Sequence, residues 1–263
     1  MTDSLQLSMV VPTYNEVERL EDFVRTVCRV LDDHRLQAEV IIVDDNSPDG
    51  TGALADRLAR ELPVHVVHRV GKLGLGSAVM AGFAVARGRL LGVMDADLSH
   101  PPDLIPVLVA ALDAAGADVV VGSRYVPGGG TKNWPLSRAV MSGAACAVAR
   151  VLTPVRDAAS GFFVLRREVI RDVAIKAAGF KICLELLVRG SARSVAEVPY
   201  VFADRAAGQS KMSHREALGY LAQIWQLFWW QRLERRPRMT YQRFGTRDVE
   251  KFLQEAASRA VSH

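Results

Sequence analysis

Short apolar runs alternate with stretches of helical periodicity through the first half of this chain, and this alternation limits the folds available to it. Five runs are predicted strands, at residues 7–11, 40–43, 64–67, 90–94 and 119–121. The segments between them are predicted helices, at residues 16–31, 51–62, 75–86 and 102–115. Strands that alternate with helices form βαβ units, so we predict an α/β fold with a mostly parallel, buried central sheet flanked by helices.

The alternation ends after residue 121, and the second half is less regular. An alanine-rich amphipathic helix is predicted at 136–152, and further strands at 162–165 and 195–201. A long helix is predicted from 214 to about 233, and a basic tail follows it.

The length of the chain favours one folded core, and its cysteine content favours an intracellular location. At 263 residues the chain is long enough for one substantial α/β core. Its three cysteines form no CxxC pair, which argues against a disulfide framework and favours a reducing compartment. The first residues show no signal-sequence pattern, and no apolar run reaches the roughly 18–20 residues that span a bilayer. We therefore expect a cytoplasmic protein that does not cross a membrane by itself.

The net positive charge of the chain indicates which kinds of molecule it could bind. A net charge of +4 and an isoelectric point of about 9.1 suit a phosphate-rich substrate or an anionic membrane surface. The sequence contains no helix-turn-helix, zinc-finger or aromatic-basic RNA-binding pattern, so a nucleic acid is not expected as a partner.

Ligands of parallel α/β sheets bind at the carboxyl ends of strands, so the loops that follow the strands are the informative ones. The first loop, PTYNE at residues 12–16, lacks the glycine-rich turn of a dinucleotide-binding domain. In the second loop, Asp45 directly follows the strand, and we predict that it accepts hydrogen bonds from a ribose or a base edge. For Asp49 in the same loop we prefer a structural role in the turn and the helix start.

The third and fourth loops carry charges that suit a diphosphate. Residues 71–76 are rich in glycine, which allows close backbone approach, and Lys72 could reach a phosphate or a carboxylate. Asp95 and Asp97 lie two residues apart at the end of the fourth strand. Two close carboxylates are costly unless a cation compensates them, and a divalent ion that bridges diphosphate oxygens would do so.

Taken together, the loop sequences PTYNE, VDDNSPDGT, GLG and DADLSHPP resemble glycosyltransferase family 2, whose members have the GT-A fold. Segments at 122–125, 133–135, 160–162, 197–199 and 204–212 extend the resemblance to the dolichol-phosphate (polyprenol-phosphate) mannose synthases. The resemblance covers about residues 7–225. It implies a GT-A domain at 1–213. We further predict an amphipathic helix at 214–235, a candidate for contact with a membrane surface, and a basic C-terminal tail at 236–263 that lies outside the resemblance.

The resemblance implies an inverting enzyme that moves mannose from GDP-mannose to a polyprenyl phosphate, with Mg²⁺ or Mn²⁺ as the cofactor. Asp97 and Ser99 would hold the metal; some relatives have glutamine in place of Ser99. The implied catalytic residues are Asp95, Asp97, Arg124 and Arg205. The implied nucleotide-sugar contacts are Pro12, Tyr14, Glu16, Val43, Asp45, Lys72, Asp95, Ala96, Asp97, Arg205 and Lys211.

Arg124, Arg138 and Ser142 are expected to hold the acceptor phosphate. A phosphate with a second pKa of about 6 is already an oxyanion near neutral pH, so it needs cations more than a base. Relatives that act on hydroxyl groups use a general-base aspartate, and Asp157 is the only candidate before Gly161. Without the resemblance, Arg138 and the pair of Arg205 and Lys211 would be interpreted as solvated surface charges.

The helix at 214–235 has aromatic residues on one face and arginines beyond its end, which suits peripheral contact with anionic lipid on the cytoplasmic side of a membrane. A core-packing helix would explain the same pattern, and a small membrane-anchoring protein could provide the contact instead. Two alternatives remain for the function. One is a related transferase that uses UDP-glucose or another acceptor; the other is an inactive nucleotide-sugar-binding scaffold.

Overall fold

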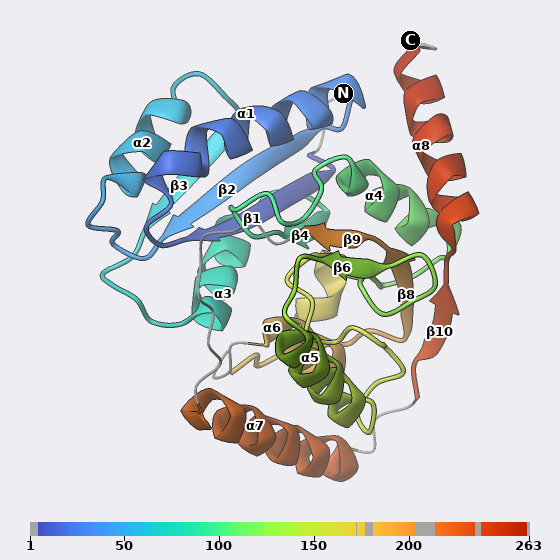
Figure 1. Ribbon diagram of the computed structural model, residues 1–263. Coiled ribbons are helices and arrows are strands. Elements are labelled where there is room, and N and C mark those ends of the chain that lie inside the picture. The colour runs from blue at the N-terminus through green and yellow to red at the C-terminus, as the bar shows by residue number, and fades with distance from the viewer. Residues whose placement is uncertain (1–4, 172, 177–180, 204–213, 235–237, 262–263) are drawn as a thin grey trace.

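The computed structural model describes residues 5–171, 173–176, 181–203, 214–234 and 238–261. Its centre is an eight-stranded sheet in the order β10-β8-β5-β7-β4-β1-β2-β3 (Figure 1). Every neighbouring pair is parallel except the two pairs that contain β7, so the predicted mostly parallel sheet is confirmed. The strands are β1 (Leu7–Thr13), β2 (Ala38–Asp44), β3 (Val64–His68), β4 (Leu90–Val93), β5 (Val119–Ser123), β7 (Phe163–Arg166), β8 (Ser194–Pro199) and β10 (Thr240–Arg243).

Helices cover both faces of this sheet because its central strands are apolar on both sides. Met9 and Val11 of β1 enter one core, whereas Val10 between them enters the other. The first core is covered by α1 (Val17–Asp33), α2 (Thr51–Leu58), α4 (Leu104–Ala114) and α8 (Thr246–Val261). The second is covered by α3 (Leu75–Val85), α5 (Leu136–Ala149), α6 (Ile182–Arg189) and α7 (His214–Leu233).

The C-terminal segment differs from the predicted basic tail. β10 pairs in parallel with β8 at the edge of the sheet, and Phe252 of α8 is buried in the first core. The sequence did not reveal β10 because this strand is short and mostly polar, so it lacks the apolar run that reveals the central strands.

The predicted strand at 195–201 is also two strands, which divide at Tyr200. The second of these, β9 (Val201–Ala203), pairs with β6 (Gly130–Lys132) in a separate two-stranded sheet.

Cys28, Cys146 and Cys183 are all buried free thiols. Within the described residues, no helix combines the length and the apolar character needed to cross a membrane.

Candidate active site

The loops that follow β1, β2, β3 and β4 meet at one edge of the sheet because these strands are parallel and in close register. Thr13 at the end of β1 lies opposite Asp44, and Val10 lies opposite Val93 at the end of β4. β5 runs in the same direction, since both β4 and β5 are antiparallel to β7. The four loops with predicted functional residues, and Arg124 after β5, therefore share this edge.

Hydrogen bonds join the first two loops to each other. Asp49 accepts from the Thr51 backbone N–H at 3.0 Å and the Val17 N–H at 3.1 Å. The Thr51 hydroxyl in turn accepts from the Glu16 N–H at 2.9 Å. The predicted structural role of Asp49 is thus confirmed, because it satisfies backbone donors at two helix starts.

Two of the residues predicted to contact the nucleotide-sugar lie together at the protein surface. Lys72 Nζ is 4.3 Å from the centroid of the Tyr14 ring, which is partly exposed. Glu16 is half-buried on the same loop as Tyr14, and Pro12 is half-buried near the end of β1. Val43 is fully buried, so neither its side chain nor its backbone is exposed to a ligand at this edge.

Asp45 is held by a cation that the sequence did not reveal. Its Oδ1 lies 2.6 Å from Arg69 Nη1, and both side chains are only 9% exposed. Arg69 also donates to the Ser77 hydroxyl at 2.6 Å, so this pair fixes the third loop and the start of α3 against the end of β2. Burial raises the pKa of Asp45, whereas Arg69 lowers it.

Glu16, Asp95 and Asp97 concentrate negative charge at this edge. Burial raises the pKa of Glu16, and the charge of Asp97 raises it further. Burial also raises the pKa of Asp95, with His100 opposing the shift and Asp97 adding to it. The Asp95 side chain is 42% exposed, so solvent limits the effect of burial. A cation placed here would relieve this repulsion.

The residues predicted to hold a metal fit a hard divalent cation. Ser99 is buried, and its hydroxyl has no hydrogen-bond partner among the described residues. Asp97 Oδ1 accepts from the Ser99 N–H at 2.9 Å, and Leu98 between them has a φ of 57°, which is unusual for leucine. Such oxygen ligands suit Mg²⁺ or Mn²⁺. The described residues contain no cluster of three His, Cys, Asp or Glu ligands, so substrate oxygens would have to complete the coordination.

His100 packs inside the protein. It is 2% exposed and stacks on Phe162 with ring centroids 5.1 Å apart. Its Nδ1 accepts from the Asp95 N–H at 3.3 Å, and burial lowers its pKa, so the neutral ring supports the Asp95 backbone.

The three predicted acceptor residues converge on one cavity of about 210 Å³ beside Asp95. Arg124 reaches it from the end of β5, while Arg138 and Ser142 reach it from α5. The Arg138 guanidinium lies 4.3 Å from the Trp134 ring centroid, so it is stacked rather than freely solvated. A Cβ on Gly161 would lie 3.1 Å from Asp95 Oδ2, so this glycine leaves room for the carboxylate.

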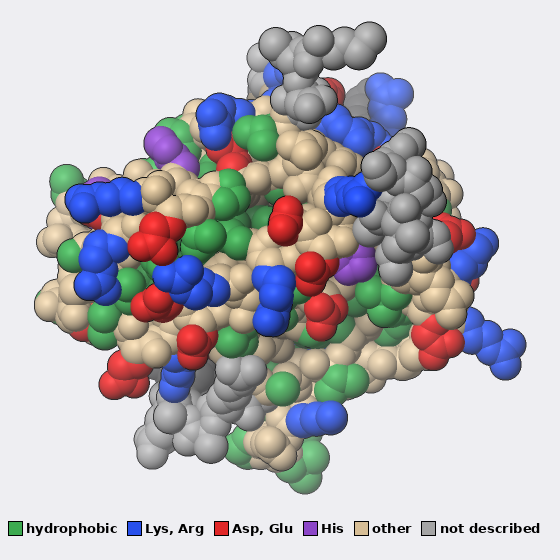
Figure 2. All heavy atoms as spheres, turned by 90° about the horizontal axis from the view of Figure 1, so that it is seen from above, with side chains coloured by type: hydrophobic (Ala, Val, Ile, Leu, Met, Phe, Trp, Pro, Cys, Tyr) green, Lys and Arg blue, Asp and Glu red, His purple; other side chains and the backbone are tan. Residues whose placement is uncertain are grey.

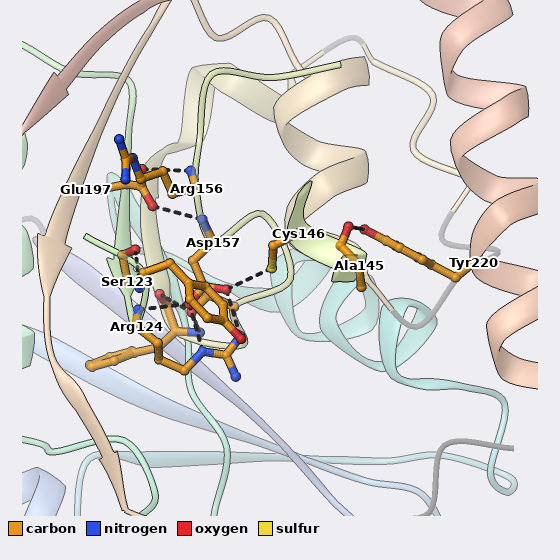
Figure 3. A network of polar contacts seen from close by, with 11 residues as sticks. Ser123, Arg124, Ala145, Cys146, Arg156, Asp157, Glu197 and Tyr220 are labelled. Carbon is orange, nitrogen blue, oxygen red and sulfur yellow. Dashed lines mark hydrogen bonds and ion pairs between the residues drawn. The ribbon is translucent and has the colours of Figure 1, made fainter. Parts of the chain in front are cut away.

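Arg124 forms a buried bidentate ion pair with Asp157, which lies 33 residues away in the sequence (Figure 3). Arg124 Nε and Nη2 each lie 2.7 Å from an Asp157 oxygen, and the Arg124 N–H adds a bond of 2.9 Å. These bonds use one edge of the guanidinium and leave its other N–H groups for the cavity. Asp157 is fully buried and engaged with Arg124, so it is poorly placed to act as a general base.

Lys181, directly before α6, also lines this cavity and was not predicted. Burial lowers its pKa, and the nearby charge of Arg124 lowers it further. As a single lysine without a surrounding pattern, it gave no signal in the sequence. Arg205 and Lys211 lie outside the described residues.

With this geometry in view, comparison with known proteins identifies the family. The sequence matches glycosyl transferase family 2 over residues 8–174, which is more than half of the chain. The chain belongs to this family. It is therefore a glycosyltransferase, and its mostly parallel sheet with flanking helices is the GT-A fold.

Curated relatives match most of the chain. A dolichol-phosphate mannosyltransferase of Pyrococcus furiosus is 42% identical, over 86% of this chain but only 65% of the relative's length. A polyprenol monophosphomannose synthase of Mycolicibacterium smegmatis is 44% identical over 82% of this chain and 85% of its own. The dolichol-phosphate mannosyltransferase of Saccharomyces cerevisiae is 37% identical, with coverages of 86% and 88%.

Solved structures support the fold. Mannosyl-3-phosphoglycerate synthase from Rubrobacter xylanophilus aligns with a TM-score of 0.62 at 19% identity, covering 89% of this chain and 76% of that one. The mannosyltransferase PcManGT from Pyrobaculum calidifontis, in complex with GDP-Man and Mn²⁺, aligns with a TM-score of 0.60 at 17% identity. That alignment covers 99% of this chain and 74% of the other.

Proposed function

We propose that this glycosyltransferase moves mannose from GDP-mannose to a polyprenyl phosphate at a membrane surface, with inversion at the anomeric carbon. The observation that carries the proposal is the cavity beside Asp95, where Arg124, Arg138, Ser142 and Lys181 converge. Its mixture of cations and a hydroxyl suits a phosphate. The names of the related mannosyltransferases support the same acceptor and sugar.

The chemistry needs no general base. An acceptor phosphate oxygen would form a bond to the anomeric carbon while the bond from that carbon to the donor diphosphate breaks, releasing GDP. The phosphate is already ionised near neutral pH, so no base has to remove a proton from it. The ion pair of Asp157 with Arg124 agrees with a reaction in which Asp157 is not a base. Arg124, Arg138 and Lys181 would position the phosphate for in-line attack.

Asp97 and Ser99 would hold the divalent cation, with Asp95 close to the sugar. When bound, Mg²⁺ or Mn²⁺ supplies positive charge that stabilises the leaving diphosphate. The solvent-bordered pair of Tyr14 and Lys72 would lie toward the nucleotide and its phosphates. Arg205 and Lys211 keep their proposed roles as donor-phosphate contacts on the strength of the family resemblance.

Replacing Arg138 with alanine should raise the acceptor KM roughly tenfold or more, because a charge-assisted hydrogen bond to phosphate is lost. The donor KM should change by less than about twofold, since Arg138 lies on the acceptor side. Steady-state kinetics with each substrate varied in turn checks this, with the exposed Arg29→Ala on α1 as the control. A larger change in the donor KM would move Arg138 out of the acceptor site.

Apolar side chains exposed on α5 and α7 support contact with a bilayer. On α7, Tyr220 is buried, and its hydroxyl donates to the Ala145 carbonyl of α5 at 2.9 Å. The other side of α7 exposes Trp225 by 63% and Trp229 by 47%, and α5 exposes Leu136 by 80%. On the face remote from α7, acidic and basic side chains are interspersed (Figure 2).

A hollow of about 760 Å³ lies between the ends of α5, α6 and α7, and arginines on its walls place positive charge near this apolar surface. It is lined by Arg150, Arg193, Arg232 and Arg238, which suit anionic headgroups. The chain would thus lie on the membrane through α5 and α7, where the acceptor's lipid tail could reach the cavity that these helices border.

Exchanging Trp225 and Trp229 for serine should reduce binding of the purified chain to vesicles of phosphatidylcholine and phosphatidylglycerol by roughly tenfold or more. Co-sedimentation measures this, and Val70→Ser is the control because Val70 is also an exposed apolar residue, 89% exposed on a loop distant from these helices in the sequence. If the wild-type chain does not bind these vesicles, direct contact is refuted, and a small anchoring protein would be needed instead.

A panel of nucleotide-sugars, each tested with Mg²⁺ or Mn²⁺ and a short polyprenyl phosphate, tests the donor. GDP-mannose should be used in preference to UDP-glucose. Preference for UDP-glucose would contradict the proposed donor while leaving the enzyme class intact, and no turnover with any donor would favour an inactive binding protein.

A further inference from the structure

Tyr241 lies on β10, in a part of the chain beyond the family match at residues 8–174. It pairs in register with Val195 of β8, and its half-buried hydroxyl donates to Glu197 Oε2 at 2.5 Å. Burial raises the pKa of Tyr241, and the hydrogen bond to Glu197 raises it further, so the phenol stays a donor near neutral pH.

Glu197 is a fully buried carboxylate, and backbone donors engage both of its oxygens (Figure 3). Oε2 accepts from the Arg156 N–H at 2.8 Å, and Oε1 accepts from the Asp157 N–H at 3.0 Å. A buried carboxylate is costly unless its oxygens are hydrogen-bonded, so the Tyr241 hydroxyl and the two N–H groups together keep Glu197 in one orientation.

The residue whose backbone Glu197 holds is the partner of Arg124. Asp157 uses its N–H toward Glu197 and its carboxylate toward Arg124, so Glu197 fixes the point from which the carboxylate extends. Arg124 in turn lines the acceptor cavity. Small displacements of a positioning group cost reaction rate even when no contact to substrate is removed.

We propose that Tyr241 is a positioning residue of the acceptor site, which acts through Glu197 and Asp157 to set the direction of Arg124. The proposal rests on the proposed acceptor role of Arg124. The proposal gives β10 a function: through Tyr241, this strand helps to hold Arg124, which follows β5 in the same sheet.

Tyr241→Phe removes the hydroxyl alone and should raise the acceptor KM about three- to tenfold, with the donor KM unchanged within about twofold. Thr240→Val is the matched control, because it removes a hydroxyl from the same strand that faces the Arg193 carbonyl at 3.3 Å and not Glu197. The control should keep the wild-type acceptor KM. Thermal unfolding of both variants shows whether the folded state is retained.

A double-mutant cycle with Arg124→Lys separates positioning from general destabilisation. If Tyr241 acts through Arg124, adding Tyr241→Phe to Arg124→Lys should raise the acceptor KM little further, whereas independent effects would multiply. Equal acceptor KM values in Tyr241→Phe and Thr240→Val, with Arg124→Lys impaired, would overturn the positioning role alone. An unchanged acceptor KM in Arg124→Lys would instead overturn the proposed acceptor role of Arg124.

Discussion

Replacing Asp97 with alanine should lower the turnover number by at least about a thousandfold while the protein stays folded. Asp97 is the carboxylate that we propose holds the cation beside the diphosphate, and among the described residues it accepts one hydrogen bond, from the Ser99 N–H. Its removal therefore costs little stability, whereas the leaving group loses its compensating charge. Steady-state turnover and urea unfolding measure the two effects separately.

Asp103→Ala is the matched control for this experiment. Asp103 is an exposed carboxylate at the start of α4, six residues beyond Asp97 in the sequence. The control should retain wild-type turnover. Unchanged turnover in Asp97→Ala would remove Asp97 from the metal site.

Replacing Asp157 with asparagine should lower the free energy of unfolding by about 3–5 kcal/mol. Both partners of the Arg124–Asp157 pair are buried, with side-chain exposures of 9% and 0%. Asparagine keeps the size of the side chain but leaves the guanidinium without a compensating charge. The acceptor KM should rise as well, because Arg124 would lose the group that orients it.

Urea unfolding of Asp157→Asn and Glu61→Gln tests this expectation. Glu61 pairs with Arg25 at 3.1 Å, but the side chains are 60% and 47% exposed, so its loss should cost less than about 1 kcal/mol. Equal unfolding free energies in the two variants would contradict a structural role for the buried pair.

The first half of the fold was predictable because each central strand is a continuous apolar run. Burial on both faces demands such runs, and the register of β1, β2 and β4 then brings the loop residues to one edge. The helix at 214–233 was also predicted with its observed ends. β10 was missed because an edge strand needs few apolar residues, and Tyr241 contributes through a hydrogen bond that no periodicity reveals.

The candidate site could be predicted from the sequence only in part. The loop motifs indicated Asp97 and Ser99 through the family resemblance. The Ser99 hydroxyl, which has no hydrogen-bond partner in the described part of the chain, agrees with that assignment. The partners that hold the site come from distant positions: Arg69 lies 24 residues from Asp45, and Asp157 lies 33 residues from Arg124. Such ion pairs depend on tertiary packing, and no local pattern predicts them.

One measurement tests the central claim most directly. The purified chain is incubated with radiolabelled GDP-mannose, Mg²⁺ or Mn²⁺ and a polyprenyl phosphate, and the reaction is then extracted with organic solvent. We predict that the label enters the organic phase and that mild acid releases mannose from the product. Label that enters only a water-soluble product would contradict transfer of the sugar to a lipid phosphate.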